Sequence, residues 1–148
     1  MYNLSLTACS FFIRKTNSRK ADKIFLLNSP IVGSFEGSEY DFSDALDLFR
    51  EFFKQYKGMV DDDIRKQTFS CEYNPLFSDE TDGFRLIYAK ILSGNYGSSS
   101  EIVDPQTREV KFSKAASDID IRPYYVFVII PKDSSDVMVQ KGMLIFKM

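Results

Sequence analysis

The sequence contains no histidine and no tryptophan among its 148 residues. Without an imidazole, the chain cannot build a serine–histidine or cysteine–histidine nucleophilic pair, a histidine-ligated zinc site or a histidine proton shuttle. Cysteine is scarce as well, since only Cys9 and Cys71 are present. Each lies in an apolar alternating stretch without metal-binding spacing, so we expect two reduced, packed thiols and no cofactor.

Long apolar runs are also missing. The longest, residues 124–130, is far shorter than the roughly 18 residues that span a bilayer. The N-terminal residues lack the basic flank and continuous apolar stretch of a secretory signal. We therefore expect a cytoplasmic protein that makes no membrane contact.

The sequence has no excess of positive charge, because 19 lysines and arginines face 21 aspartates and glutamates, a net charge of −2. No global positive field draws such a chain toward nucleic acid. The early part of the chain is nevertheless basic. A nucleic-acid-binding module is therefore one alternative hypothesis, and it would use Arg14, Lys15, Arg19, Lys20 and Lys23.

Aromatic residues are abundant, with 14 phenylalanines and eight tyrosines in a chain of otherwise ordinary globular composition. Large rings are therefore expected to fill the core. The length fits one domain over residues 1–148. The last apolar segment, 143–146, is not followed by a polar tail. We therefore expect either that this segment pairs at the centre of the sheet or that the chain is the N-terminal part of a longer protein.

One amphipathic helix is predicted over residues 41–57. Its apolar residues recur at spacings of three and four, as on one face of a helix, and Phe49 and Phe53 lie one turn apart on that face. Asp41 is the expected N-cap, and Gly58 is placed for a C-terminal cap. The face is Phe42, Ala45, Leu46, Phe49, Phe52, Phe53 and Tyr56.

Alternating and β-branched segments predict the strands. Residues 84–92 and 124–130, the second opened by Pro123, are apolar on both phases and are expected at the sheet's centre, whereas 61–63 and 78–83 are expected in loops. The fold class is therefore α+β, a mainly antiparallel sheet of six to eight strands with helix 41–57 packed on one face. The other strands are predicted at 4–13, 23–27, 67–73, 101–103, 109–112 and 143–146, with 4–13 and 23–27 forming a hairpin and a second hairpin turning at 104–107.

The most enzyme-like feature is Glu109-Val110-Lys111, because an acid and a lysine two residues apart share one face of a strand. Restriction-type nucleases hold a magnesium ion with such a pair and a further aspartate. A magnesium-dependent nuclease is therefore a second alternative, with Asp104, Asp118 and Asp120 as available partners. Charged alternation on an exposed hairpin produces the same pattern, and no dedicated metal site is assigned.

A glycine-flanked segment, residues 94–97, precedes three serines. It could bind phosphate, but no helix signal follows to cradle the anion and the lysine-bearing Walker pattern is missing. We expect a flexible connector whose exposed Tyr96 and neighbouring Asn95 contact a protein partner.

The features of the C-terminal half resemble a pattern in uncharacterised bacterial proteins of prophages and defence islands. The likeness covers about residues 84–148 and rests on 94–97, the hairpin at 103–110, 118–125, 130–131 and 142–146. It implies a setting in phage–host conflict and a longer parent protein, and it transfers no catalytic residue.

The leading hypothesis is a non-enzymatic protein-interaction domain whose partner is unidentified. It follows from the missing histidine, the lack of converging polar residues and the aromatic richness. Self-association into a homo-oligomer is a corollary, because an edge strand near the C-terminus would pair with a second copy.

Overall fold

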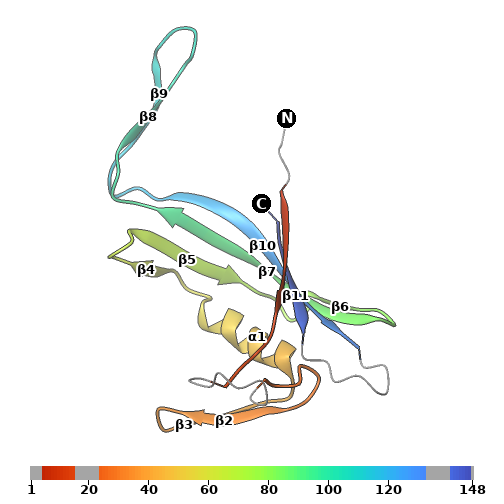
Figure 1. The fold of residues 1–148 in the computed structure, drawn as a ribbon. Helices are drawn as coiled ribbons and strands as arrows, with labels where there is room; N and C mark the ends of the chain where they lie inside the picture. The colour runs from red at the N-terminus through yellow and green to blue at the C-terminus, as the bar shows by residue number, and fades with distance from the viewer. Residues whose placement is uncertain (1–4, 16–23, 133–140, 148) are drawn as a thin grey trace.

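The computed structural model describes residues 5–15, 24–132 and 141–147, which form one large sheet, two hairpins and one helix (Figure 1). The large sheet has seven antiparallel strands in the order β1-β11-β10-β7-β5-β4, and β6 pairs with β7. Its strands are β1 (Leu6–Phe11), β4 (Val60–Asp62), β5 (Gln67–Glu72), β6 (Ser78–Glu80), β7 (Phe84–Asn95), β10 (Asp120–Pro131) and β11 (Gly142–Lys147).

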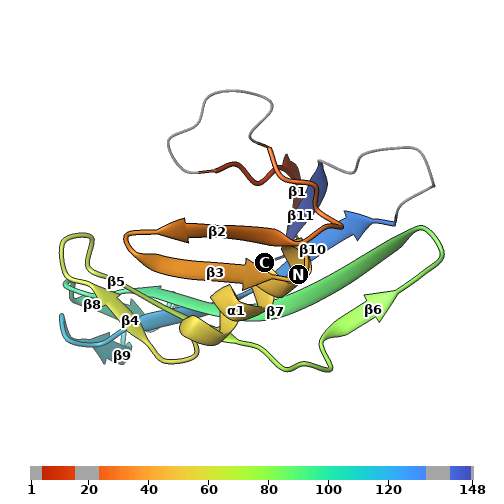
Figure 2. The same ribbon diagram turned by 90° about the horizontal axis from the view of Figure 1, so that it is seen from below.

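The two hairpins lie away from this sheet, one on each side. The strands β2 (Ile31–Phe35) and β3 (Ser38–Phe42) form a hairpin beside the helix α1 (Ala45–Gln55) (Figure 2). The strands β8 (Ser100–Val103) and β9 (Val110–Lys114) form the second hairpin, which projects from the end of β7 and β10 (Figure 1). The predicted hairpin around 104–107 is thus confirmed.

The core lies between α1 and one face of the large sheet. Leu46 and Phe53 of the helix are 1% and 2% exposed, and they belong to one buried cluster with Ile87 of β7 and Val128 of β10. Phe49 packs against this cluster. The predicted fold class, a mainly antiparallel sheet with one helix on one face, is confirmed.

The helix is shorter than the predicted 41–57. It begins at Ala45 because residues 38–42 pair with β2, and its N-cap is Asp44 in place of Asp41. The Asp44 carboxylate accepts a hydrogen bond from the Asp47 amide at 2.9 Å and a charged one from the Arg85 guanidinium of β7 at 2.8 Å. One side chain therefore caps the helix and fastens it to the sheet.

Several other boundaries are corrected. Strand 23–27 is reduced to one isolated bridge between Arg14 and Ile24, and the tip of that predicted hairpin, 16–23, lies outside the described residues. The first two residues of the predicted loop 61–63 belong to β4. The predicted loop 78–83 likewise contains β6. Pro123 lies inside β10, which extends back to Asp120.

The final strand is not at an edge of the sheet. β11 pairs with β10 on one side and with β1 on the other, so the edge is β1. The prediction of self-association assumes that the strand near the C-terminus lies at an edge. That assumption is wrong, because β11 lies inside the sheet. In the described parts of the chain, no helix combines the length and apolar character needed to cross a membrane.

Truncation of Phe53 tests the packing of the helix. Because this ring is 2% exposed, Phe53→Ala should lower the free energy of unfolding by about 3–5 kcal/mol through lost burial and a cavity. Its neighbour Phe52 is 41% exposed, so Phe52→Ala should cost only roughly 1–2 kcal/mol. Urea unfolding of both variants measures the difference, and equal losses would contradict the packing described.

Candidate functional site

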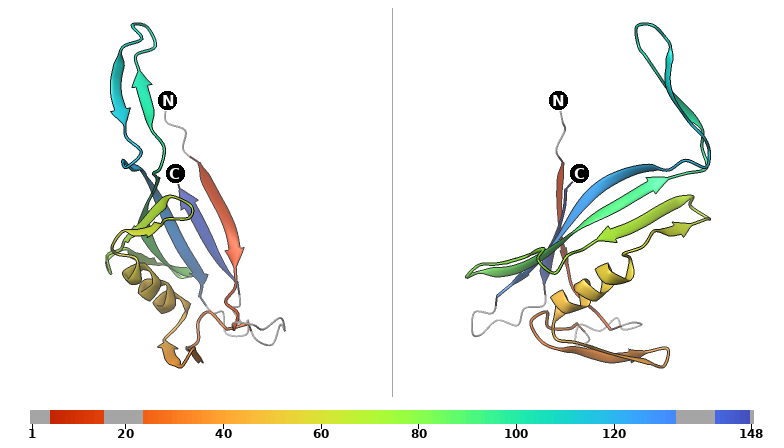
Figure 3. Two further views of the ribbon diagram at one scale, coloured as in Figure 1. Left: turned by 90° about the vertical axis from the view of Figure 1, so that its left-hand side faces the viewer. Right: turned by 180° about the vertical axis from the view of Figure 1, so that it is seen from behind.

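The face of the large sheet opposite α1 is the main candidate surface. Side chains alternate along each strand: Ile87 and Ala89 of β7 are fully buried toward the helix, so Leu86 and Tyr88 point to the other side. Figure 3 shows α1 and the β2–β3 hairpin on the same side of the sheet. We call the opposite side the open face; its apolar side chains include Leu6, Ala8, Leu86, Tyr88, Tyr125, Phe127, Ile129, Met143 and Ile145.

The strand register places these side chains in rows that run across four strands. The middle row is Tyr88, Phe127, Ile145 and Ala8, and it is entirely apolar or aromatic. The Tyr88 ring lies 5.5 Å from the Phe127 ring. The next row is Leu86, Ile129, Met143 and Ser10.

The third row gives the open face a charged border. It contains Lys90, Tyr125, Lys147 and Leu6, so two lysines flank the apolar centre on one side. The Lys90 ammonium lies 3.3 Å from the carboxylate of Glu72 on β5.

Exposure shows that the open face meets solvent. Leu6 is 65% exposed, Met143 44% and Tyr125 39%. In the described residues, no second layer of helix or sheet lies over these side chains (Figures 1 and 3). Contiguous apolar surfaces of this kind mark interaction sites on soluble domains.

The β8–β9 hairpin, which we call the arm, is the second apolar surface. Figures 1 and 3 show it rising on the side of the sheet opposite α1. Ile102 and Phe112 lie directly across from one another and are 62% and 56% exposed, and Val103 and Val110 are 42% and 51% exposed. A two-stranded hairpin with uncovered apolar side chains is marginally stable in water, so the arm is suited to packing against another surface.

The tip of the arm brings together two residues of the nuclease hypothesis, Asp104 of the turn and Lys111 of β9. The Asp104 carboxylate accepts hydrogen bonds from the Gln106 and Thr107 amides at 2.8 and 3.0 Å and lies 3.5 Å from the Lys111 ammonium. These backbone hydrogen bonds, aided by Lys111, hold the pKa of Asp104 below its ordinary value. The Asp104 carboxylate therefore stabilises the turn of the arm.

The remaining candidates are not gathered around that pair. A β-bulge at Lys111 interrupts the alternation that would place it and Glu109 on one face. At the base of the arm, Asp118 accepts a hydrogen bond from the Ala115 amide, and Asp120 pairs with Arg122 at 3.3 Å. Across the described ranges, no three histidine, cysteine, aspartate or glutamate residues are grouped to hold a metal ion.

Tyr96 follows directly after β7, which extends to Asn95 and so takes in the start of the predicted connector, and its side chain is partly exposed. Its phenol donates a hydrogen bond to the Asp63 carboxylate at 2.8 Å, and the Lys66 ammonium lies 5.5 Å from the ring centroid. The Tyr96 amide donates to the Lys66 carbonyl at 3.0 Å. Asn95 ends β7, exposed, opposite Gln67 of β5. Asp63 and Lys66 are thus the partners that sequence reasoning missed.

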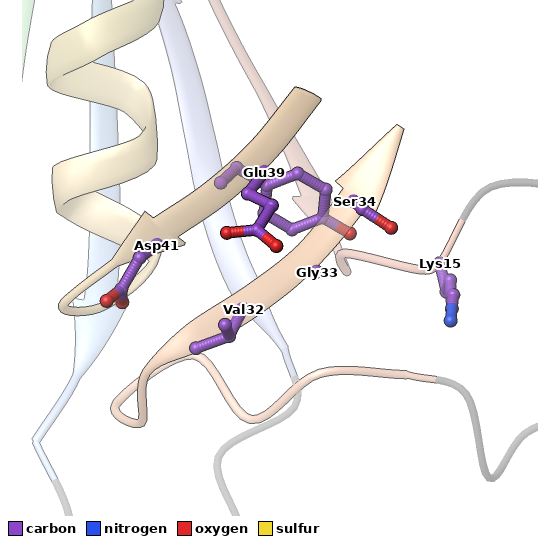
Figure 4. Close-up of a pocket in the computed structure, with 7 residues that line it drawn as sticks. Lys15, Val32, Gly33, Ser34, Glu39 and Asp41 are labelled. Carbon is purple, nitrogen blue, oxygen red and sulfur yellow. The ribbon is translucent and has the colours of Figure 1, made fainter. Parts of the chain in front are cut away.

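The basic N-terminal residues are only partly described. The Arg14 guanidinium lies 5.0 Å from the Phe12 ring centroid, and Arg19, Lys20 and Lys23 lie outside the described residues. Lys15 borders a shallow pocket of about 440 Å³ against the β2–β3 hairpin (Figure 4). Its other lining residues are Val32, Gly33, Ser34, Glu39, Tyr40 and Asp41. The two carboxylates among them disfavour the binding of a phosphate group there.

Comparisons with protein-family models, with curated proteins and with solved structures find no match for this chain. The functional inference therefore depends on its own side chains and their arrangement.

The contact between Tyr96 and Asp63 can be tested by titration. The hydrogen bond to Asp63 is the main cause that raises the pKa of Tyr96 to about 12, from 10.0. Asp63→Asn should bring this pKa back toward the ordinary value, whereas Asp61→Asn, which removes a weaker charge effect, should change it less. Absorbance titration of tyrosinate, with Tyr96→Phe to isolate its signal, measures both.

The sign of the stability effect follows from this direction. Because the folded pKa is the higher one, the hydrogen bond stabilises the fold below pH about 10, and its contribution disappears as the pH rises through about 12. An unchanged Tyr96 titration in Asp63→Asn would show that the two groups are not in contact.

Proposed function

We propose that this chain is a protein-interaction domain that binds a protein partner through the open face. The observation that carries the proposal is the apolar row Tyr88, Phe127, Ile145 and Ala8, which is continuous over four strands. Ala8 is exposed and the three larger side chains are partly exposed. Water contact with such a row is unfavourable by about 25 cal/mol per Å² of apolar surface. A partner that covers the row removes this penalty.

The chemical composition of the open face supports the same proposal. Tyrosine, phenylalanine and methionine are enriched at the centres of protein interfaces, and Tyr88, Tyr125, Phe127 and Met143 lie on this surface. The side chains stand on paired strands, so little backbone order has to be gained on binding. The partner expected for this surface has an apolar centre.

Charge and shape add to the description of the partner. Lys90 and Lys147 lie in one border row, so acidic residues on that rim of the partner would complement them. The arm projects on the same side of the sheet as the open face (Figure 1), and Ile102 and Phe112 would be buried by a partner that reaches from one to the other. The resemblance to prophage and defence-island proteins would make this partner a phage or host protein, which stays a prediction.

Charge introduced into the open face tests the proposal. Tyr125 and Met143 are 39% and 44% exposed, so the double variant Tyr125→Glu, Met143→Glu should fold normally. It should lose a specific partner by about 10-fold or more, as expected when a desolvated contact worth about 1.4 kcal/mol or more is removed. Affinity capture from the native host with quantitative mass spectrometry measures the loss.

Ile64→Glu provides the matched control, because Ile64 is 96% exposed in the turn after β4 and lies off the open face. The unmodified chain and this control should retain the same protein, and thermal melts should show that all three chains are folded. Equal retention by the double variant, or no specific protein on the unmodified chain, would refute the proposal.

A further inference from the structure

The two edges of the large sheet are protected very differently. One edge, β4, has only three residues, and two of them are Asp61 and Asp62. The other edge, β1, has six residues, and from residue 5 to residue 13 the sequence contains no charge and no proline. Short length, charge and proline are the devices that prevent edge strands from pairing with other chains, and β1 has none of them.

The outer side of β1 offers unpaired backbone groups. All six of its residues are in register with β11 on the inner side, from Leu6 opposite Lys147 to Phe11 opposite Gly142. In an antiparallel ladder, alternate residues point their N–H and C=O groups to the two sides. No hydrogen bond joins the outer side of Leu6–Phe11 to another described residue.

We propose that β1 pairs antiparallel with β1 of a second copy of this chain, about a twofold axis, so that two large sheets become one. The two paired strands are identical, so their lengths match. Because β1 is uncharged, the two copies bring no like charges together along the ladder. Each β1 edge is covered by the β1 edge of the other copy, so this contact joins two chains and no more.

Twofold pairing allows only registers in which one residue lies opposite itself, and the centre of β1 allows Ala8 or Cys9. In both registers Leu6 and Ala8 stay on the open face. The open faces of the two copies therefore join into one apolar surface, which would present a partner with two symmetry-related halves. The dimer itself requires no partner and is tested without one.

Solution mass and a substitution test the proposal. Sedimentation of the purified chain should show a concentration-dependent shift from 17.1 kDa to twice that mass. Ala8→Lys places a lysine directly opposite its own copy in the Ala8 register and diagonally across from it in the Cys9 register, and it should weaken the dimer by 10-fold or more. Val60→Lys puts the same charge on the β4 edge, where Val60 is 47% exposed, and should leave the dimer unchanged.

Cross-linking of the unmodified chain gives an independent readout. Cys9 is exposed on β1 and Cys71 is fully buried, so a short bismaleimide should join two chains through Cys9. A strict monomer at every concentration would overturn the proposal. A dimer that survives Ala8→Lys would also do so, as would one that does not cross-link through Cys9 or that grows into longer assemblies.

Discussion

The size of one helix limits how much of this sheet the chain can cover. At 11 residues α1 is about 16 Å long, whereas the 12-residue strands β7 and β10 extend about 40 Å. The helix is held at one place by Asp44, which caps it and binds Arg85 of β7. It therefore closes a core on one face, together with the β2–β3 hairpin, and leaves the open face to solvent. The proposed binding of a protein partner follows from the exposure of this face.

The central strands show how much of the fold the sequence predicts. Segments 84–92 and 124–130 are apolar on both phases, and their central place in the sheet is confirmed. That pattern is typical of strands buried on both faces. Among the described residues, however, the buried side chains of these two segments all lie on the helix side: Ile87, Ala89, Val126, Val128 and Ile130. The apolar second phase, read from the sequence as core, is the surface that we propose a partner covers.

The sequence predictions that the structure corrects failed for local and for long-range reasons. Tyr40 and Phe42 alternate along β3 and lead directly into the helical spacing of α1, so the sequence pattern merges a strand with the helix that follows. The bond between Tyr96 and Asp63 joins residues 33 positions apart, and a local pattern holds no signal for it. The bulge at Lys111 shifts the phase of β9 in a segment whose composition predicts regular alternation.

The central claim is that the open face of the isolated chain meets water, and hydroxyl-radical footprinting with mass spectrometry tests it most directly. Met143 on the open face should oxidise as readily as Met59, which is 51% exposed near β4, and Tyr125 should also react. Phe53, in the core beneath the helix, should be protected until the chain unfolds. Protection of Met143 and Tyr125 to the level of Phe53 would show that the chain covers this face itself, and would contradict the account.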